Sequence, residues 1–118
     1  MRERTKRTEM LLGAEAMERL CAAHVIVFGL GGVGSWCAEA LARSGVGRLT
    51  LVDEDAVSES NINRQLCALG STIGASKAEA MAARLRDIAP GAAIVPVTAR
   101  YEAASRGRFF PGDYACAA

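Results

Sequence analysis

Two short apolar runs, separated by a helical pattern, dominate the first half of the chain. Residues 25–28 read Val-Ile-Val-Phe, and residues 48–52 end in Leu-Thr-Leu-Val; short runs with several β-branched residues are typical of buried strands. Residues 33–44 carry a helical pattern that stops at Gly45 and Gly47, and glycine commonly follows the end of a helix. The pattern predicts a strand, a helix and a second, parallel strand, joined as a right-handed unit.

Two more helices are predicted on either side of this unit. Residues 1–8 are basic and are expected to be a solvated, frayed terminus, whereas residues 9–20 have the apolar stripe of a helix. Residues 71–89 begin with capping residues and continue as an amphipathic helix that Pro90 and Gly91 end. The stripes consist of Met10, Leu11, Ala14, Met17 and Leu20 in the first helix and of Ala75, Ala78, Met81, Ala82, Leu85 and Ile88 in the second.

The last part of the chain predicts further strands. Residues 94–97 read as a third strand, and Pro96 within it predicts an edge position or a bulge, because proline has no N–H to donate. Residues 101–110 form a short amphipathic segment, residues 111–113 a turn, and residues 114–118 the beginning of another strand. The predicted fold is α/β: a Rossmann-like, mostly parallel sheet with helices on both faces, preceded by an N-terminal helix and ending before the later strands.

The turn after the first strand carries the strongest chemical signal. Gly29, Gly31 and Gly34 have the G-x-G-x-x-G spacing, directly after a predicted strand and before a predicted helix. In this context the glycines allow a tight turn, bring the backbone close to a phosphate and let the helix pack near the strand, while the helix N-terminus attracts an anion. Asp53 ends the second strand, 24 residues after Gly29, where an acid can bind ribose hydroxyls. The sequence therefore predicts a site for an adenine nucleotide.

The segment that follows Asp53 is unusually polar. Residues 54–65 contain acids, amides and one arginine. They read either as a surface loop with Asx turns or as a nucleotide clamp, in which Asp55 helps to hold ribose or a metal and Arg64 pairs with phosphate. Lys77 lies at the predicted start of the next helix, where the helix dipole disfavours a cation. A phosphate partner would explain that lysine, and a solvated side chain is the alternative.

Composition and charge exclude several classes of protein. The 118 residues are 51% hydrophobic and 23% charged, which suits one globular domain and argues against disorder. The formal net charge of +1 gives no general attraction to nucleic acid, so an RNA partner would need a local basic patch. No apolar run approaches the roughly 18 residues of a membrane-spanning helix, and the N-terminus has no signal-peptide pattern. These features predict a soluble, cytoplasmic protein with no membrane partner.

The remaining reactive residue types give no catalytic or metal pattern. No two cysteines form a C-x-x-C pair, so a zinc knuckle within the chain is not expected, and each cysteine is interpreted as a reduced, structural thiol. His24 is the only histidine and is interpreted as structural, because no nearby serine or cysteine forms a catalytic couple with it. Trp36 is assigned to the core in preference to an interface. The cysteines are Cys21, Cys37, Cys67 and Cys116.

Taken together, these motifs resemble the ubiquitin-activating-enzyme superfamily. Its members include ThiF-type bacterial adenylyltransferases that activate sulfur-carrier proteins in thiamin and molybdopterin synthesis. The shared pattern consists of the spaced glycines, Asp53 and Asp55, the string S-N-I-N-R-Q at residues 60–65, and Lys77.

Within that superfamily the chain is most similar to the tRNA threonylcarbamoyladenosine dehydratases, through residues 7–13, 34–45 and 63–69. Such enzymes use ATP to activate the carboxylate of threonylcarbamoyladenosine beside the anticodon of certain tRNAs. The resemblance implies that this carboxylate attacks the α-phosphate of ATP and releases pyrophosphate. The carbamoyl group then closes onto the acyl adenylate, which gives a cyclic product and a net ATP-driven dehydration. The implied cofactors are ATP and Mg²⁺, the implied substrate is tRNA, and a sulfur-transfer partner protein is compatible with the resemblance.

The resemblance also implies roles for individual residues. Asp53 would hold the ribose, Gln65 would help to position the nucleotide, and Arg64 and Lys77 would neutralise phosphate charge in the transition state. Arg7 matches an arginine that reaches into the partner subunit's site, which implies a homodimer. The implied nucleotide-binding residues are Gly29, Gly31, Gly32, Gly34, Asp53, Asp55, Asn61, Arg64, Gln65 and Lys77, and the implied catalytic residues are Arg64, Lys77 and Arg7.

One departure from the superfamily concerns the metal. The superfamily carries a further aspartate just beyond the strand that starts near Tyr114, and that aspartate helps to hold magnesium. This chain ends at Ala118 before such a residue, and Asp113 precedes the strand. No metal ligand is therefore predicted here, and residues 1–118 are interpreted as the N-terminal part of a ThiF-type ATP-binding domain. From such a truncated chain we expect weak ATP binding and little or no turnover.

Three other functions remain open. A sulfur-carrier adenylyltransferase of the thiamin or molybdopterin type would use the same ATP residues. A dinucleotide-dependent dehydrogenase would explain the glycine spacing and Asp53, but it has no need of the polar segment or Lys77. A non-catalytic nucleotide-binding or dimerisation module would fit the short length of the chain.

Overall fold

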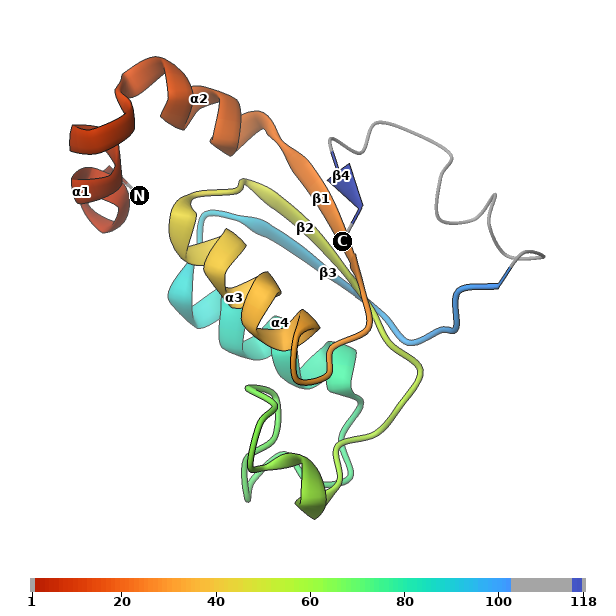
Figure 1. Ribbon diagram of the computed structural model, residues 1–118. Helices are drawn as coiled ribbons and strands as arrows, with labels where there is room; N and C mark the ends of the chain where they lie inside the picture. The colour runs from red at the N-terminus through yellow and green to blue at the C-terminus, as the bar shows by residue number, and fades with distance from the viewer. Residues whose placement is uncertain (1, 103–115, 118) are drawn as a thin grey trace.

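The computed structural model describes residues 2–102 and 116–117 (Figure 1). These residues form one four-stranded sheet with the order β3-β2-β1-β4, in which all neighbouring strands are parallel. The α/β class and the parallel sheet predicted from the sequence are therefore confirmed. The elements along the chain are α1 (Arg2–Leu12), α2 (Ala14–Ala22), β1 (His24–Phe28), α3 (Gly34–Ser44), β2 (Arg48–Val52), the 3-10 helix η1 (Glu59–Asn61), α4 (Lys77–Ile88), β3 (Ala93–Val97) and β4 (Cys116–Ala117).

The core lies between the sheet and two helices. In Figure 1, α3 and α4 lie side by side against one face of the sheet. Alternate side chains of the strands point to this face, and they pack there with apolar side chains of the two helices. The buried cluster includes Val25, Val27, Leu49, Leu51 and Ile94 from the strands and Ala38, Ala42, Met81 and Leu85 from the helices. Ile26 and Val52 form a smaller buried cluster, with Phe28, Val97 and Ala99 packed against it.

The pairing of β1 with β2 places the predicted site. The two strands pair from His24 opposite Arg48 to Phe28 opposite Val52, so both reach the same edge of the sheet. The first residue after β1, Gly29, donates its N–H to the carbonyl of Val52, 2.8 Å away. The glycine loop and the residues that follow β2 are therefore neighbours.

The N-terminal region differs from its prediction. Residues 2–8 belong to helix α1, so the expected frayed terminus is wrong for them. The guanidinium of Arg4 donates to the carbonyl of Ile88 (3.3 Å), a long-range contact at the end of α4 that local charge could not predict. The single helix expected over residues 9–20 is interrupted at Gly13, whose φ of 88° is left-handed and stops α1.

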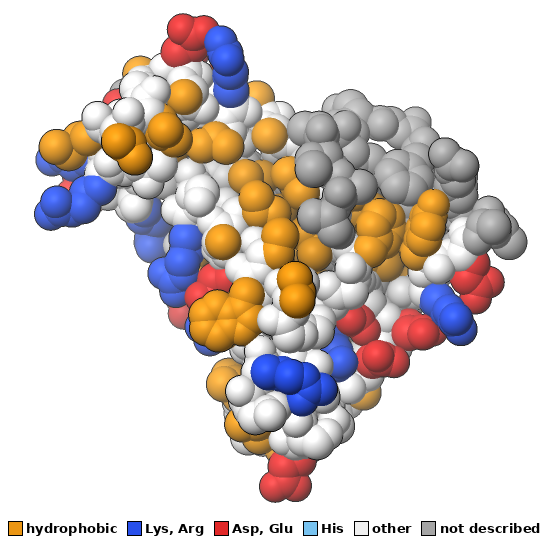
Figure 2. All heavy atoms as spheres, viewed as in Figure 1, with side chains coloured by type: hydrophobic (Ala, Val, Ile, Leu, Met, Phe, Trp, Pro, Cys, Tyr) orange, Lys and Arg blue, Asp and Glu red, His pale blue; other side chains and the backbone are white. Residues whose placement is uncertain are grey.

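This interruption divides the apolar stripe predicted for the N-terminal helix. Met17 on α2 is buried, whereas Met10 and Leu11 at the end of α1 are 77% and 83% exposed. Figure 2 shows hydrophobic side chains gathered on the surface over α1 and α2. The stripe therefore covers two helices with different surroundings, and its first half does not face the core.

Helix α4 starts at Lys77, as predicted, after a segment that contains its cap. Residues 71–75 form turns, and the helix starts at Lys77, where the hydroxyl of Ser76 accepts the N–H of Glu79 (3.4 Å). Four of the predicted apolar positions, Ala78, Met81, Ala82 and Leu85, are buried. The predicted apolar face is thus confirmed at these four positions, whereas Ala75 precedes the helix.

Strand β3 occupies an outer position of the sheet, as Pro96 predicted. The N–H of Ala93 and the carbonyl of Val97 both bond towards β2. Because consecutive residues of a strand alternate in direction, Ile94 and Pro96 present their backbone groups to the open edge. There the guanidinium of Arg86 donates to the carbonyl of Ile94 (2.9 Å).

The end of the chain is described in part. Only residues 101 and 102 of the predicted segment 101–110 belong to the described residues. The predicted turn at residues 111–113 lies outside them. Residues Cys116–Ala117 pair with β1, which confirms a strand in the predicted region. No helix in the described part of the chain is long and apolar enough to cross a membrane.

Candidate nucleotide-binding site

The glycine loop brings α3 very close to the end of β1. A Cβ atom on Gly34 would lie 1.7 Å from the carbonyl oxygen of Gly29, so no larger residue fits without moving the backbone. Asp53 holds the loop from the neighbouring strand, because its Oδ2 accepts the N–H of Leu30 (2.7 Å) and its Oδ1 accepts the N–H of Asp55 (2.8 Å). A carboxylate has about four acceptor positions, so Asp53 can shape the loop and still accept ribose hydroxyls.

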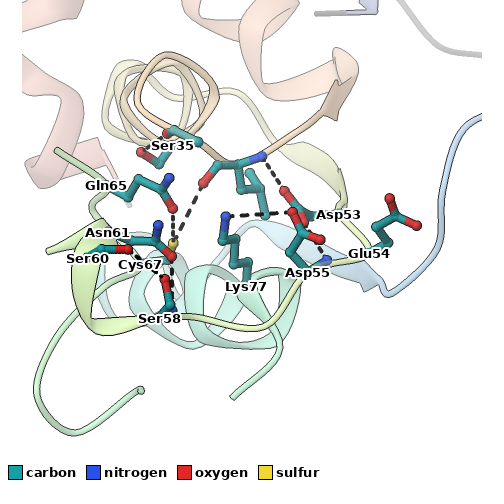
Figure 3. Close-up of polar contacts among 12 residues, drawn as sticks. Ser35, Asp53, Glu54, Asp55, Ser58, Ser60, Asn61, Gln65, Cys67 and Lys77 are labelled. Carbon is teal, nitrogen blue, oxygen red and sulfur yellow. Dashed lines mark hydrogen bonds and ion pairs between the residues drawn. The ribbon is translucent and has the colours of Figure 1, made fainter. Parts of the chain in front are cut away.

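Lys77 points into the space between the glycine loop and the segment that follows β2 (Figure 3). Its side chain is only 9% exposed, and its Nζ lies 3.9 Å from Oδ2 of Asp55. The backbone N–H of Lys77 also donates to the carbonyl of Asp55 (3.0 Å). The carboxylate of Asp55 offsets part of the cost of placing a buried cation at a helix start. The solvated alternative for Lys77 is therefore wrong.

The polar segment folds back towards the glycine loop. Asn61 is buried, and its side-chain oxygen accepts the N–H of Ser58 (2.9 Å), which completes a capping box around η1. Asn61 therefore holds the turn that carries Arg64 and Gln65. A Cβ atom placed on Gly32 would lie 3.5 Å from the Arg64 side chain, and one placed on Gly31 would lie 3.8 Å from Nε2 of Gln65.

The first turn of α3 contributes two residues that the sequence analysis did not place in the site. The hydroxyl of Ser35 donates to the carbonyl of Gly31 (2.6 Å) and accepts the N–H of Leu66 (3.2 Å). The indole N–H of Trp36 donates to the carbonyl of Arg64 (2.9 Å). Trp36 is 57% exposed, so its assignment to the core is wrong. A polar residue next to a tryptophan at a helix start was the available signal for such contacts.

Cys67 lies beneath the same loop. Its Sγ is 3.6 Å from the carbonyl oxygen of Leu30 and 3.9 Å from Oε1 of Gln65, and burial raises the pKa of this thiol. Cys67 is therefore protonated at neutral pH and packs as a structural thiol, as expected. Cys21 is exposed and Cys37 half-buried, and all three of these cysteines are unpaired.

Residues 5–114 match the ThiF family model. The chain belongs to the ThiF family. A tRNA threonylcarbamoyladenosine dehydratase of Bacillus subtilis is 48% identical over 108 residues, which are 92% of this chain and 42% of the relative. A molybdopterin-synthase adenylyltransferase of Salmonella typhimurium is 44% identical over 88 residues, 75% of this chain and 35% of the relative.

The fold of this ThiF-family chain also matches a solved structure. The crystal structure of Escherichia coli tRNA N6-threonylcarbamoyladenosine dehydratase in complex with ATP gives a TM-score of 0.96 at 40% identity, and the match covers 98% of this chain and 48% of that one. The chain therefore spans less than half the length of the relatives that it matches here.

A shallow hollow lies beside Asp53 in this ThiF-family chain. It has a volume of about 220 Å³, and Phe28, Val52 and Tyr101 line its apolar part. The rings of Phe28 and Tyr101 lie with their centroids 4.7 Å apart. Figure 2 shows acidic side chains gathered around this edge of the molecule. An apolar wall next to a carboxylate suits a base and its ribose.

Two other predicted residues lie outside this group. Arg7 is exposed on α1, which Figure 1 places beyond the opposite ends of the strands, so it does not approach the glycine loop of its own chain. His24 is buried, with its Nε2 2.8 Å from Oγ1 of Thr50, in keeping with its structural interpretation.

The predicted metal has no ready-made site in the described residues, which contain no group of three or more metal-ligating side chains. Both oxygens of Asp53 already accept backbone N–H groups, and Asp55 faces Lys77. Mg²⁺ that enters with ATP needs only one or two carboxylates besides the phosphates. The described residues therefore do not form a complete site for the ion by themselves.

Proposed function

We propose that this ThiF-family chain is the N-terminal, nucleotide-binding part of an enzyme that uses ATP to adenylate and then cyclise threonylcarbamoyladenosine in tRNA. One observation carries the proposal. The glycine loop, Asp53, the Arg64–Gln65 segment and Lys77 converge at the carboxyl ends of β1 and β2, in a fold that an ATP-bound dehydratase shares.

The proposed chemistry assigns each of these groups a task. The backbone N–H groups of the loop and the positive end of α3 bind the phosphates, and Asp53 accepts the ribose hydroxyls. A carboxylate oxygen of the modified adenosine attacks the α-phosphorus, and pyrophosphate leaves. Lys77 and Arg64 neutralise the charge that develops on the phosphate oxygens. The carbamoyl group then attacks the acyl adenylate, and AMP leaves as the ring closes.

We also propose that the protein acts as a homodimer. Arg7 lies on an exposed helix at the end of the sheet away from its own site, so it can serve a site only in a second copy. Exposed Met10 and Leu11 on the same helix give that helix an apolar surface for such a contact. Sedimentation equilibrium tests the dimer, and an Arg7→Ala dimer should keep its mass and lose adenylation.

ATP binding by the 118-residue chain tests the nucleotide site. Calorimetric titration should detect ATP, which AMP displaces and reduced nicotinamide cofactor does not. Lys77→Met should weaken ATP binding, and Glu15→Gln on exposed α2 should not. Binding of the nicotinamide cofactor in preference to ATP would revive the dehydrogenase and overturn the proposal.

Substrate choice tests the enzymatic part. In the enzyme that contains this chain, threonylcarbamoylated tRNA should stimulate exchange between ATP and labelled pyrophosphate. Stimulation by a small protein with a Gly-Gly tail instead would favour a sulfur-carrier adenylyltransferase, the second candidate, which the similarity to the Salmonella enzyme supports. ATP binding without exchange in the presence of either acceptor would indicate a non-catalytic module.

A further inference from the structure

The first turn of α3 grips the Arg64 segment at two consecutive residues. Ser35 accepts the N–H of Leu66, and Trp36 donates to the carbonyl of Arg64, so the two contacts bracket Gln65. Ser35 also donates to the carbonyl of Gly31. One hydroxyl therefore joins the glycine loop, α3 and the segment that carries the arginine.

Besides the two contacts to α3, buried Cys67 joins this segment to the loop, since its Sγ lies 3.6 Å from the carbonyl oxygen of Leu30. The guanidinium of Arg64 donates to the carbonyl of Ser60 (3.1 Å) and to Oδ1 of Asn63 (2.8 Å), both within its own segment. The arginine is therefore held to its own segment, and the two contacts to α3 are the ones that join the backbone on either side of Gln65 to the start of that helix.

The surroundings of Trp36 fit such a role better than a packing role. More than half of its surface is exposed, so burial does not account for a tryptophan at this position. The indole N–H is donor-only, and a backbone carbonyl fixes the direction in which the ring lies. The main-chain carbonyl of Arg64 accepts that N–H, and the side chain of Arg64 lies next to Gly32.

We infer that Ser35 and Trp36 are positioning residues, which hold Arg64 at a set distance from the glycine loop so that both act on one phosphate chain. This inference rests on the proposed nucleotide site. Neither side chain is required to touch the nucleotide. Preorganised cations stabilise developing charge most effectively. Removing the Ser35 or the Trp36 contact should therefore weaken the interaction of Arg64 with phosphate and leave the fold in place.

Trp36→Phe tests the inference because it keeps an aromatic ring and removes the N–H. One hydrogen bond of this kind corresponds to about a two- to tenfold change in an equilibrium constant. We expect ATP affinity to fall by that factor in the wild-type background and to stay unchanged when Trp36→Phe is added to Arg64→Ala. The Trp36 contact is to the main chain of Arg64, so Arg64→Ala leaves its acceptor in place. Equal losses in both backgrounds would overturn the inference.

Ser35→Ala has a matched control in Ser44→Ala on the same helix. Ser44 bonds the carbonyl of Ala40 within α3, so its loss should not change ATP affinity, whereas Ser35→Ala should lower it. If Ser44→Ala lowers ATP affinity as much as Ser35→Ala does, the bracket has no special role.

Amide hydrogen exchange without nucleotide separates this inference from the proposed function. Trp36→Phe, at an exposed position, should speed exchange in residues 60–66 by about two- to tenfold with an unchanged melting temperature. Ser35→Ala should speed exchange in the same residues at least as much. If the wild-type chain binds no ATP but exchange is faster in the two variants, the proposed nucleotide site is wrong and the positioning role of Ser35 and Trp36 is supported. Unchanged exchange in both variants would overturn the bracket whatever ATP does.

Discussion

The two ends of the sheet differ in how they use space and charge. A hollow of about 360 Å³ lies at the amino ends of the strands, between α1 and the ends of α3 and α4, whereas the hollow beside Asp53 is about 220 Å³. At the amino ends, Arg4 and Arg43 are engaged by Ile88 and Glu39. At the carboxyl ends, a buried lysine, loop N–H groups and a shared carboxylate converge. Convergence of polar groups, and not volume, marks the candidate site.

The largest loss of folding free energy should come from glycine-to-alanine substitutions, one at each end of the sheet. Gly34→Ala places Cβ 1.7 Å from the Gly29 carbonyl oxygen, and Gly47→Ala places it 1.8 Å from that of Cys21. Both should cost about 3 kcal/mol or more of folding free energy, measured by urea unfolding. Gly70→Ala is the control, because nothing lies within 4 Å of its Cβ position.

The two glycine variants should part when ATP is added. ATP should stabilise the folded fraction of Gly47→Ala and leave Gly34→Ala unchanged, since the latter alters the glycine loop that we propose binds the phosphates. Equal stabilisation of both by ATP would mean that the two ends do not differ as described.

A smaller effect, on ATP affinity, should distinguish Lys77 at the carboxyl ends of the strands from Arg4 at the amino ends. Lys77→Met removes a buried charge that faces the loop, and loss of a charge-assisted contact should weaken ATP binding by about 1.5–3 kcal/mol. Arg4→Met, at the amino ends, should leave ATP affinity unchanged, by calorimetric titration. The melting temperature of Lys77→Met should not fall, because methionine fills the buried site without a charge; a large fall would assign Lys77 a structural task.

A pH-dependent effect is expected midway between the ends, where α3 meets α4. Arg84, by its hydrogen bond, lowers the pKa of Glu39. A lowered folded-state pKa stabilises the protein above the ordinary pKa of glutamate, and that stabilisation is lost as the pH falls through the lowered value.

Glu39→Gln should therefore cost about 1–2 kcal/mol at neutral pH, and the difference from wild type should vanish in acid. Urea unfolding from pH 7 down to pH 3 measures it. Glu15→Gln, which breaks an exposed pair with Arg19 on α2, should cost less than about 0.5 kcal/mol at any pH. A Glu39→Gln penalty that persisted in acid would point to lost packing instead of lost charge.

The mildest test uses thiols at the two ends. Cys21 is exposed at the amino ends, whereas Cys67 is buried beneath the loop with a raised pKa, so less of it is the reactive thiolate. Iodoacetamide should modify Cys21 well before Cys67, as followed by peptide mass spectrometry, and ATP should slow only Cys67. Denaturant should remove the difference; a difference that survived unfolding would not be due to structure.

The parts of this fold that were predictable are those that depend on near neighbours in sequence. The run from β1 through the glycine loop to β2 has its strand, turn and helix signals in order, and the structure follows them. The missing N–H of Pro96 predicted an edge position or a bulge, and the strand lies at the edge. Lys77 also lies at the start of its helix, as its sequence pattern predicted.

The errors arise where distant segments meet. Trp36 was assigned to the core by residue type, but its position depends on a segment about 28 residues later that folds back onto α3. Residues 2–8 have the basic composition of a frayed terminus, yet they form part of α1, which contacts the end of α4 through Arg4. The side-chain oxygen of Asn61 accepts the N–H of Ser58, a contact that depends on the exact turn and that the sequence pattern did not predict.

The outer strand β3 has a consequence for how the protein behaves when crowded with copies of itself. An exposed strand edge invites another strand to pair with it, which is a route to aggregation. On this edge Pro96 supplies no donor, and the Ile94 carbonyl is already taken by Arg86. A strand from another molecule would find no N–H donor at Pro96 and an occupied carbonyl at Ile94. These residues should therefore disfavour edge-to-edge aggregation along β3.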